Sequence, residues 1–135
     1  MTVVKNDAQA LPSSYGLPSG TDVFIAVPPG VNPQAVVNQT SGLSLPGLVY
    51  AYRPGGPLDY KNINPMYDAL GNFLFGAAGA KHGSSCGTMT GIGDLAHGGA
   101  NNPINTGDIQ SGFNALANGG QLSVIDTESP NFPNW

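Results

Sequence analysis

Charged residues are scarce in this sequence. Only 9% of its 135 residues are Asp, Glu, Lys or Arg, against roughly 25% in typical soluble domains. The net charge is −4, and the basic residues are Lys5, Arg53, Lys61 and Lys81. Because long nucleic acids are bound mainly through contacts of Lys and Arg with phosphates, this charge balance argues against a long nucleic-acid ligand. An acidic chain also gains little from an anionic membrane surface.

Cysteine and long apolar runs are also scarce. Cys86 is the single cysteine of the sequence, which excludes an internal disulfide framework. No apolar run approaches the roughly 20 residues that a helix needs to span a bilayer. The first residues lack the basic region and apolar stretch of a signal peptide. We therefore expect no membrane partner, and if the chain leaves the cytoplasm we expect another component to carry it.

Glycine and proline are abundant instead, with 20 Gly and 12 Pro. Disordered chains reach similar levels, but here the apolar residues cluster into patterned segments, which indicates an ordered domain. Residues 1–20 are rich in Ser, Pro and Gly and show no period, so we interpret them as a leader or a linker from a larger parent chain. Residues 21–135 then form the domain.

Strand and helix patterns alternate along that domain. Residues 23–27 form a β-branched and aromatic run that a proline pair ends, which is typical of a buried strand. Asn32 and Pro33 predict the start of a short helix, as a cap residue followed by a proline. Residues 45–53 alternate as a second strand would, and residues 121–126 predict a last one.

Two main helices are predicted. Asn64 and Pro65 repeat the start signal, and the apolar residues that follow recur at helical spacing at Met66, Leu70, Phe73 or Leu74, and Ala77. Three glycines inside this helix, Gly71, Gly76 and Gly79, indicate close backbone approach to a packed neighbour or a ligand. Residues 106–117 predict the second helix, with Ile109, Phe113 and Leu116 on one face.

Residues 83–105 are rich in glycine and predict a long functional or mobile loop. Together these patterns predict a small single α+β domain with two main helices, a short antiparallel sheet and a long glycine-rich loop.

The segment from Leu58 to His82 combines polar residues with the strongest helix pattern. Asp59 and Lys61 flank Tyr60, so in an extended chain their side chains share a face. The lysine could then stabilise an anion while the aspartate handles a proton. The alternative is a surface ion pair that contributes little to stability.

The same segment resembles the bacterial toxin 44 family, in its DYK step and in the helix YDALGNFLFGAAGA. The likeness covers about 25 residues strongly. The matching positions are Asp59, Tyr60, Lys61, Gly71, Asn72, Phe73, Gly76 and Gly79. The resemblance implies the toxic domain of a secreted bacterial effector, with a secretion-system carrier or larger parent chain and a cognate immunity protein as partners. It also implies delivery into a target bacterium, where we expect action in the periplasm rather than the cytoplasm.

Two positions depart from the family pattern. Leu74 replaces a polar residue, commonly histidine, and Phe75 replaces a tyrosine. Any imidazole chemistry must therefore come from His82 or His97, and the departures leave open whether the site is still active. For His82, the alternative is a capping role at the end of its helix.

Other combinations carry less specific signals. Asp94, His97 and Asp108 together could ligate a metal, but their spacing matches no zinc pattern. Cys86 with His82 or His97 could act as nucleophile and base. The alternative is that Cys86 is an inert thiol with no role in catalysis. We expect neither a metal nor another cofactor.

The family resemblance, together with the low number of basic residues, leads us to expect a hydrolase that acts on bacterial cell-wall peptidoglycan. In a glycosidase mechanism Asp59 and Asp68 would flank the scissile bond, one of them as proton donor. Asp68 could instead only complement the dipole of its helix.

Two other functions fit the sequence. An RNase-type toxin would use His82 or His97 as base and Lys61 or Lys81 to stabilise charge on the phosphate. A non-enzymatic binding or structural module derived from a toxin fold would use none of them.

Overall fold

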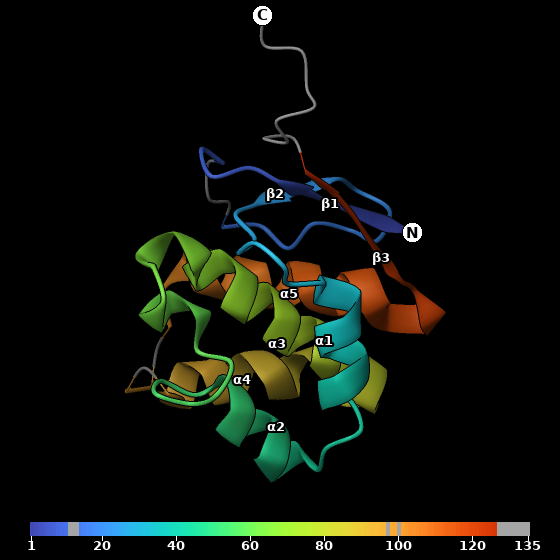
Figure 1. Ribbon diagram of the computed structural model, residues 1–135. Helices are drawn as coiled ribbons and strands as arrows, with labels where there is room; N and C mark the ends of the chain where they lie inside the picture. Colours follow the sequence, from blue (N-terminus) through green and yellow to red (C-terminus); the bar gives the residue numbers. More distant parts are fainter. Residues whose placement is uncertain (11–13, 97, 100, 127–135) are drawn as a thin grey trace, which may run out of the picture.

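The computed structural model describes residues 1–10, 14–96, 98–99 and 101–126. A small sheet covers one side of a helical body (Figure 1). The sheet consists of β1 (Thr2–Asn6), β2 (Val23–Ile25) and β3 (Leu122–Asp126) in the order β2-β1-β3. Both strand pairs are parallel, with Val4 opposite Val23 on one side and Val124 on the other. The prediction of an antiparallel sheet is therefore wrong.

The direction of these strands follows from their connections. Sixteen residues, 7–22, separate β1 from β2 in the chain, and the helical body lies between β2 and β3. Parallel strands need such crossovers, whereas antiparallel neighbours can be joined by a tight turn. The apolar pattern that predicted strands at residues 23–27 and 121–126 indicates burial but carries no information on direction.

Residues 1–20, expected to be a leader or linker, contribute the central strand of the sheet. Val4 of β1 is completely buried, and Thr2 is nearly so. The Thr2 hydroxyl also accepts a hydrogen bond from the Gly20 backbone N–H at 3.0 Å. The first residues of the chain are thus part of the folded domain.

The helical body contains more helix than the sequence predicted. Within the described residues it comprises α1 (Pro33–Thr40), α2 (Leu45–Tyr52), α3 (Asp68–His82), α4 (Cys86–Ala96) and α5 (Pro103–Leu116), with 3-10 turns at Tyr60–Asn62, Pro65–Tyr67 and Ala117–Gly119. The predicted start of α1 is confirmed, because the Asn32 side chain accepts a hydrogen bond from the Ala35 N–H at 3.2 Å. Asn102 caps α5 in the same way, through the Ile104 N–H at 2.8 Å.

Two segments predicted otherwise are helical. Residues 45–53, expected to be a strand, form α2, which Ser44 caps through the Gly47 N–H at 3.3 Å. Its buried residues, Leu48 and Ala51, are three apart, which is a helical spacing. The expected loop over residues 83–105 contains α4, where tertiary packing outweighs the low helix propensity of glycine.

The helices α3 and α5 pack side by side at unusually close range. A Cβ atom on Gly76 would lie 1.9 Å from the Ile109 carbonyl oxygen, and one on Gly112 would lie 1.8 Å from that of Phe73. Because only glycine fits at both places, the two backbones meet directly. Packing thus explains Gly76, and it explains Gly79, whose position faces the Met89 side chain. Gly71 has open space around it.

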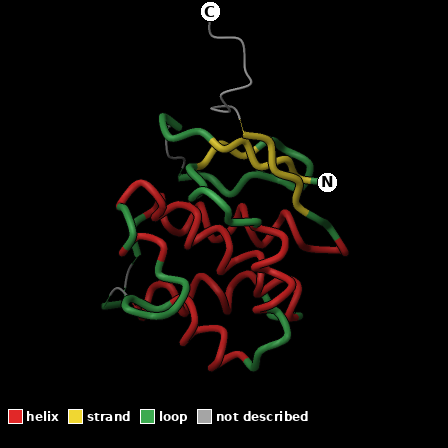
Figure 2. Tube along the Cα trace, viewed as in Figure 1, coloured by secondary structure: helices red, strands yellow, loops and turns green. Residues whose placement is uncertain are grey.

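Apolar side chains on both sides of this helix pair form the core. One cluster joins the sheet to α3 and α5, through residues such as Val4, Phe73 and Leu116. A second cluster lies away from the sheet, around Phe75 and Met89. Figure 2 shows the strands confined to one side of the helices, so α3 and α5 link the two clusters. No helix among the described residues has both the length and the apolar character needed to cross a bilayer.

Candidate functional site

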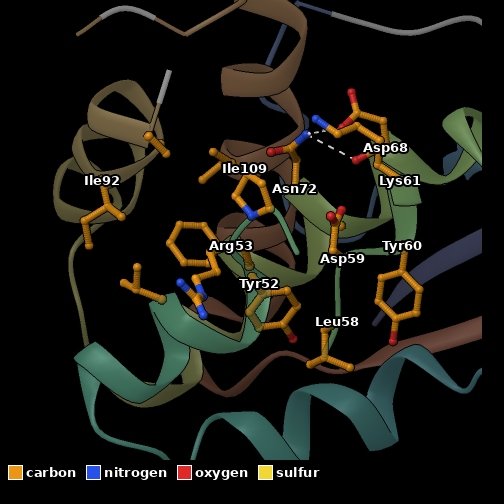
Figure 3. Close-up of a pocket in the computed structure, with 16 residues that line it drawn as sticks. Tyr52, Arg53, Leu58, Asp59, Tyr60, Lys61, Asp68, Asn72, Ile92 and Ile109 are labelled. Atoms are coloured by element: carbon orange, nitrogen blue, oxygen red, sulfur yellow. Dashed lines mark hydrogen bonds between the residues drawn. The ribbon is translucent and has the colours of Figure 1, made fainter. Parts of the chain in front are cut away.

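A pocket of about 100 Å³, here called the central pocket, opens on the side of α3 that faces α2 and α4. Figure 3 shows its lining. Its apolar wall includes Phe75, Ile92 and Ile109, which also belong to or pack against the second core cluster. Its polar lining consists of Tyr52, Arg53, Asp59, Tyr60, Lys61, Asp68 and Asn72.

Four of the six predicted site residues meet at this pocket. Asp59 and Lys61 come from the segment before α3, whereas Asp68 and Asn72 belong to α3 itself. In Figure 3 these four side chains lie on one side of the pocket, across from Ile92. Gly71 lines the pocket between them, and its missing side chain leaves space there.

The carboxylate of Asp59 is held by the turn that precedes it. Its Oδ2 atom accepts a hydrogen bond from the Gly55 backbone N–H at 2.8 Å. Gly55 has a φ of +78°, which glycine adopts without strain. Asp59 and Lys61 form no ion pair. The ion pair found among the described residues joins Lys5 to Asp22 at 3.9 Å. The alternative of a simple Asp59–Lys61 surface pair is therefore not what the structure contains.

Asp68 is held by Asn72, one helical turn further along α3. The Asn72 side-chain amide donates to the Asp68 carbonyl oxygen at 3.1 Å and to its Oδ1 at 3.4 Å. Asp68 is the first residue of α3, where the helix dipole favours a negative charge. The carboxylate is thus oriented by its neighbour and remains at the pocket wall.

Arg53 adds a second cation to the same pocket. Its guanidinium carbon lies 4.3 Å from the centre of the Tyr50 ring, in a cation–π contact. With Lys61, it brings two of the four basic side chains of the sequence to the pocket. Local positive charge therefore accompanies the two carboxylates, although the whole chain is acidic.

Tyr52 and Tyr60 line the central pocket as uncharged phenol groups. Burial raises the pKa of Tyr52 far above its usual range, and its hydroxyl bonds the Thr40 hydroxyl at 3.0 Å. Burial also raises the pKa of Tyr60. Neither phenol is suited to lose a proton near neutral pH.

A second and larger pocket of about 350 Å³ lies next to the sheet. This sheet-side pocket is formed by the loop after β1, by β2, and by the N-terminal parts of α3 and α5. Its lining includes four aspartates, Asp7, Asp22, Asp68 and Asp108. Because Asp68 lines both pockets, the two lie on either side of the start of α3.

Asp108 is the described carboxyl group with a strongly altered acidity. Burial, followed by the nearby negative charge of Asp68, raises the pKa of Asp108 to about 7. A carboxyl group with such a pKa exchanges its proton near neutral pH, which is typical of functional sites.

The sequence analysis named Asp108 only as a possible metal ligand. The structure confirms the burial of Ile109 and Leu116 on α5, leaves Phe113 half-buried, and also buries Asp108, Gly112 and Ala115. One signal in the sequence could have indicated that Asp108 is buried. Asp108 lies four residues before Gly112, on the side of α5 that carries small residues.

Among the described residues, the other candidate positions do not line either pocket. His82 lies at the C-terminal end of α3, with its Nδ1 atom 3.2 Å from the Ser84 hydroxyl, and it lines neither pocket. His97 falls outside the described residues. Leu74, at the family's histidine position, is fully buried in the core. Leu74 therefore contributes to core packing, and its side chain has no group that could act as a base.

The arrangement of the described residues does not support the metal-site or the catalytic-thiol hypothesis. Among the described residues no three His, Cys, Asp or Glu side chains are grouped closely enough to hold a metal ion. Asp94 instead accepts a hydrogen bond from the Asn101 N–H at 3.1 Å. Burial raises the pKa of the half-buried Cys86 thiol, which disfavours the reactive thiolate.

Comparisons of the chain with protein-family models, with curated proteins and with solved structures found no match. The resemblance to the bacterial toxin 44 family therefore stays a prediction based on the short segment around Asp59 and α3.

Proposed function

We propose that this chain is the toxic domain of a bacterial effector, and that it hydrolyses the peptidoglycan of a target cell wall. One observation carries the proposal: Asp59 and Lys61, which precede α3, line the same pocket as Asp68 and Asn72 of α3. These are also positions on which the family resemblance depends, apart from Asp68. A cognate immunity protein and a secretion carrier belong to the same proposal.

The central pocket has the groups that glycoside hydrolysis requires. One carboxyl group protonates the leaving oxygen while a second carboxylate activates water or attacks the sugar. Asp59 and Asp68 are the carboxyl groups available, and each has one oxygen held by an N–H donor. Lys61 and Arg53 supply positive charge for acidic groups of the substrate or for charge that develops during the reaction.

The composition supports a cell-wall substrate over a long nucleic acid. The chain has four basic residues against eight acidic ones, and phosphate backbones are bound mainly by basic side chains. Neutral hydrogen-bonding residues such as Asn72 suit a carbohydrate or peptide. Action in the periplasm follows from such a substrate.

Digestion of purified sacculi tests this function. The domain is incubated with peptidoglycan, and released fragments are separated by chromatography and assayed for new reducing ends. We expect fragments from the wild type and a loss of at least a hundredfold in rate for Asp59→Asn and Asp68→Asn, in line with the usual effect of removing an acid or base, roughly 10² to 10⁴. Asp94→Asn is the matched control, because Asp94 lines neither pocket.

An RNase-type toxin is the second candidate, and the presence of Arg53 and Lys61 in one pocket favours it. Expression in the cytoplasm and export to the periplasm of a test bacterium separate the two functions. Killing only after export supports the wall hydrolase, whereas killing and RNA cleavage in the cytoplasm support the nuclease. If Asp59→Asn, Asp68→Asn and Lys61→Ala all leave toxicity unchanged, the domain acts as a non-enzymatic binding module.

A further inference from the structure

The sheet-side pocket combines acidic groups with partly exposed apolar side chains. Its lining includes Asp68 and the buried Asp108, and it contains no Lys, Arg or His among the described residues. Three of its apolar lining residues are partly exposed: Phe24 is 50% exposed, Met66 40% and Ile104 36%. Carboxyl groups beside exposed apolar side chains match a ligand with a cationic end and an aliphatic stem.

Asp108 lacks compensation for its burial. Its side chain is only 9% exposed, and Oδ2 is buried with no hydrogen-bond partner among the described residues. Ser111, on the same pocket wall, donates instead to the Gly107 carbonyl oxygen at 2.9 Å. Asn105 donates to the Asn101 side chain at 3.2 Å. The Ser111 hydroxyl and the Asn105 amide, which line the same pocket, thus donate to other acceptors.

The outer carboxylates of the pocket are in a different situation. Asp22 pairs with Lys5 at 3.9 Å, and Asp7 accepts a hydrogen bond from the Gln9 N–H at 2.9 Å. The buried carboxyl oxygen without a hydrogen-bond partner among the described residues is therefore that of Asp108, and Asp68 adds a second negative charge near it. A buried carboxyl group without a partner costs free energy, and a bound cation would remove that cost.

We propose that the sheet-side pocket binds a primary ammonium group on an aliphatic stem. The ammonium group lies at the carboxyl groups of Asp108 and Asp68, and the stem packs on Phe24, Met66 and Ile104. An ammonium group fits better than a metal ion, because the described residues contain no group of three metal ligands. The same chemistry occurs in free diamines and in lysine side chains of peptides. This binding site shares Asp68 with the proposed hydrolytic site, but binding of the amine does not require hydrolysis.

Titration of the full chain with cadaverine tests the proposal, with binding measured by calorimetry and by backbone amide NMR at pH 8. We expect saturable shifts at Phe24, Ile104 and Asp108. The neutral probe 1-pentanol, which has the same stem, should cause no comparable shifts. Asp108→Asn should weaken cadaverine binding about tenfold or more, a change of roughly 1.4 kcal/mol. Asp94→Asn makes the same change in net charge away from the pocket and should stay within about twofold.

A second source of the ammonium group is tested with Nα-acetyl-lysine amide. Tighter binding of this probe than of cadaverine identifies a peptide lysine as the ligand, and the opposite order identifies a free amine. Phe24→Ala, at an exposed position, should weaken both probes several-fold without affecting the fold. At pH 5.5 both should bind more weakly, because Asp108 is then protonated. Asp68, Asp7 and Asp22 are the other charged groups that line this pocket, and Asp22 pairs with Lys5.

Three results would overturn the proposal. The first is equal affinity of wild type and Asp108→Asn for cadaverine, the second is equal binding of 1-pentanol, and the third is no binding of either amine at millimolar concentration. None of these measurements depends on peptidoglycan hydrolysis. An inactive hydrolase that binds cadaverine would therefore remove the proposed function and leave this inference intact.

Discussion

The carboxyl groups of Asp68 on α3 and Asp108 on α5 repel one another, and this repulsion adds to burial in raising the pKa of Asp108 to about 7. Both residues line the sheet-side pocket, and Asp68 also lines the central pocket. The start of α3 thus connects the place where we propose catalysis with the place where we propose ligand binding. The consequences can be measured without knowing the substrate.

The pH dependence of stability should reveal Asp108. Its pKa rises from 3.8 to about 7 on folding, so between these values the folded protein holds a proton that the unfolded chain has released. The stability contributed by Asp108 is therefore full below about pH 4 and is lost as the pH rises through about 7. Asp108→Asn removes this loss, which amounts to roughly 4 kcal/mol at most, at about 1.36 kcal/mol per pKa unit.

Urea denaturation at pH 4.5 and pH 8 measures the effect. We expect the free energy of unfolding of Asp108→Asn to gain on that of the wild type between the two pH values. Asp94→Asn serves as the control, since Asp94 lines neither pocket and should show no such gain. Parallel pH profiles for Asp108→Asn and the wild type would contradict the interpretation.

The contact between α3 and α5 should not tolerate a single added methyl group. At Gly76 and Gly112 a Cβ atom would lie within 2 Å of backbone oxygen on the facing helix, at 1.9 and 1.8 Å. Backbone cannot move aside as a flexible side chain can, so the helices must separate. We expect Gly76→Ala and Gly112→Ala each to lower the free energy of unfolding by about 3 kcal/mol or more.

Gly71→Ala is the matched control for these two variants. Gly71 lies in α3, the helix that contains Gly76, and a Cβ atom there would meet nothing within 4 Å. Alanine has the higher helix propensity, so this variant should gain up to about 1 kcal/mol. Thermal denaturation of the three variants tests this expectation. Equal gains at all three positions would show that helix propensity, and not the contact between the helices, determines the effect.

Local signals in the sequence were sufficient for some elements. Asn32 with Pro33 marked the start of α1, which the structure confirms, because caps are read from adjacent residues. Asn64 with Pro65 instead begins the 3-10 turn Pro65–Tyr67, and α3 starts only at Asp68. The interior glycines of α3 indicated close approach, which Gly76 shows. The sequence could not identify the partner, because Ile109 lies on another helix.

Other elements depended on contacts distant in the sequence. Alternation at residues 45–53 favoured a strand, although Ser44 was already a suitable helix cap, and packing against α3 decides for a helix. Sheet direction depends on crossovers that no local pattern encodes. At the site, Asp59, Lys61, Asp68 and Asn72 were found because they are close in sequence, whereas Asp108 becomes notable only where α5 meets α3.

Leu74 provides a test of the departure from the family pattern. The side chain is fully buried in the sheet-side core, so Leu74→His places a polar ring where no water reaches. We expect a loss of roughly 3 kcal/mol in the free energy of unfolding, whereas Leu74→Met should lose less than about 1.5 kcal/mol. Chemical denaturation compares the two. A stable Leu74→His protein with raised hydrolytic activity would show instead that this position reaches the site.

Asn72 should act on the reaction through Asp68. Its amide donates to the Asp68 carbonyl oxygen and to Oδ1, at 3.1 and 3.4 Å, and therefore fixes the direction of the carboxylate at the pocket wall. If Asp68 serves as base or nucleophile, Asn72→Ala should lower kcat for peptidoglycan cleavage about tenfold while KM changes little, because misorientation affects the transition state more than binding.

Asn72→Asp supplies the control for this positioning role. It keeps the size of the side chain but replaces the amide donor with a second negative charge beside Asp68, so kcat should fall at least as far as in Asn72→Ala. Because Asn72 is half-buried, both variants should unfold within about 1 kcal/mol of the wild type. A large rise in KM with unchanged kcat would instead make Asn72 a direct substrate contact, since a lost contact that is equal in ground and transition states appears in KM alone.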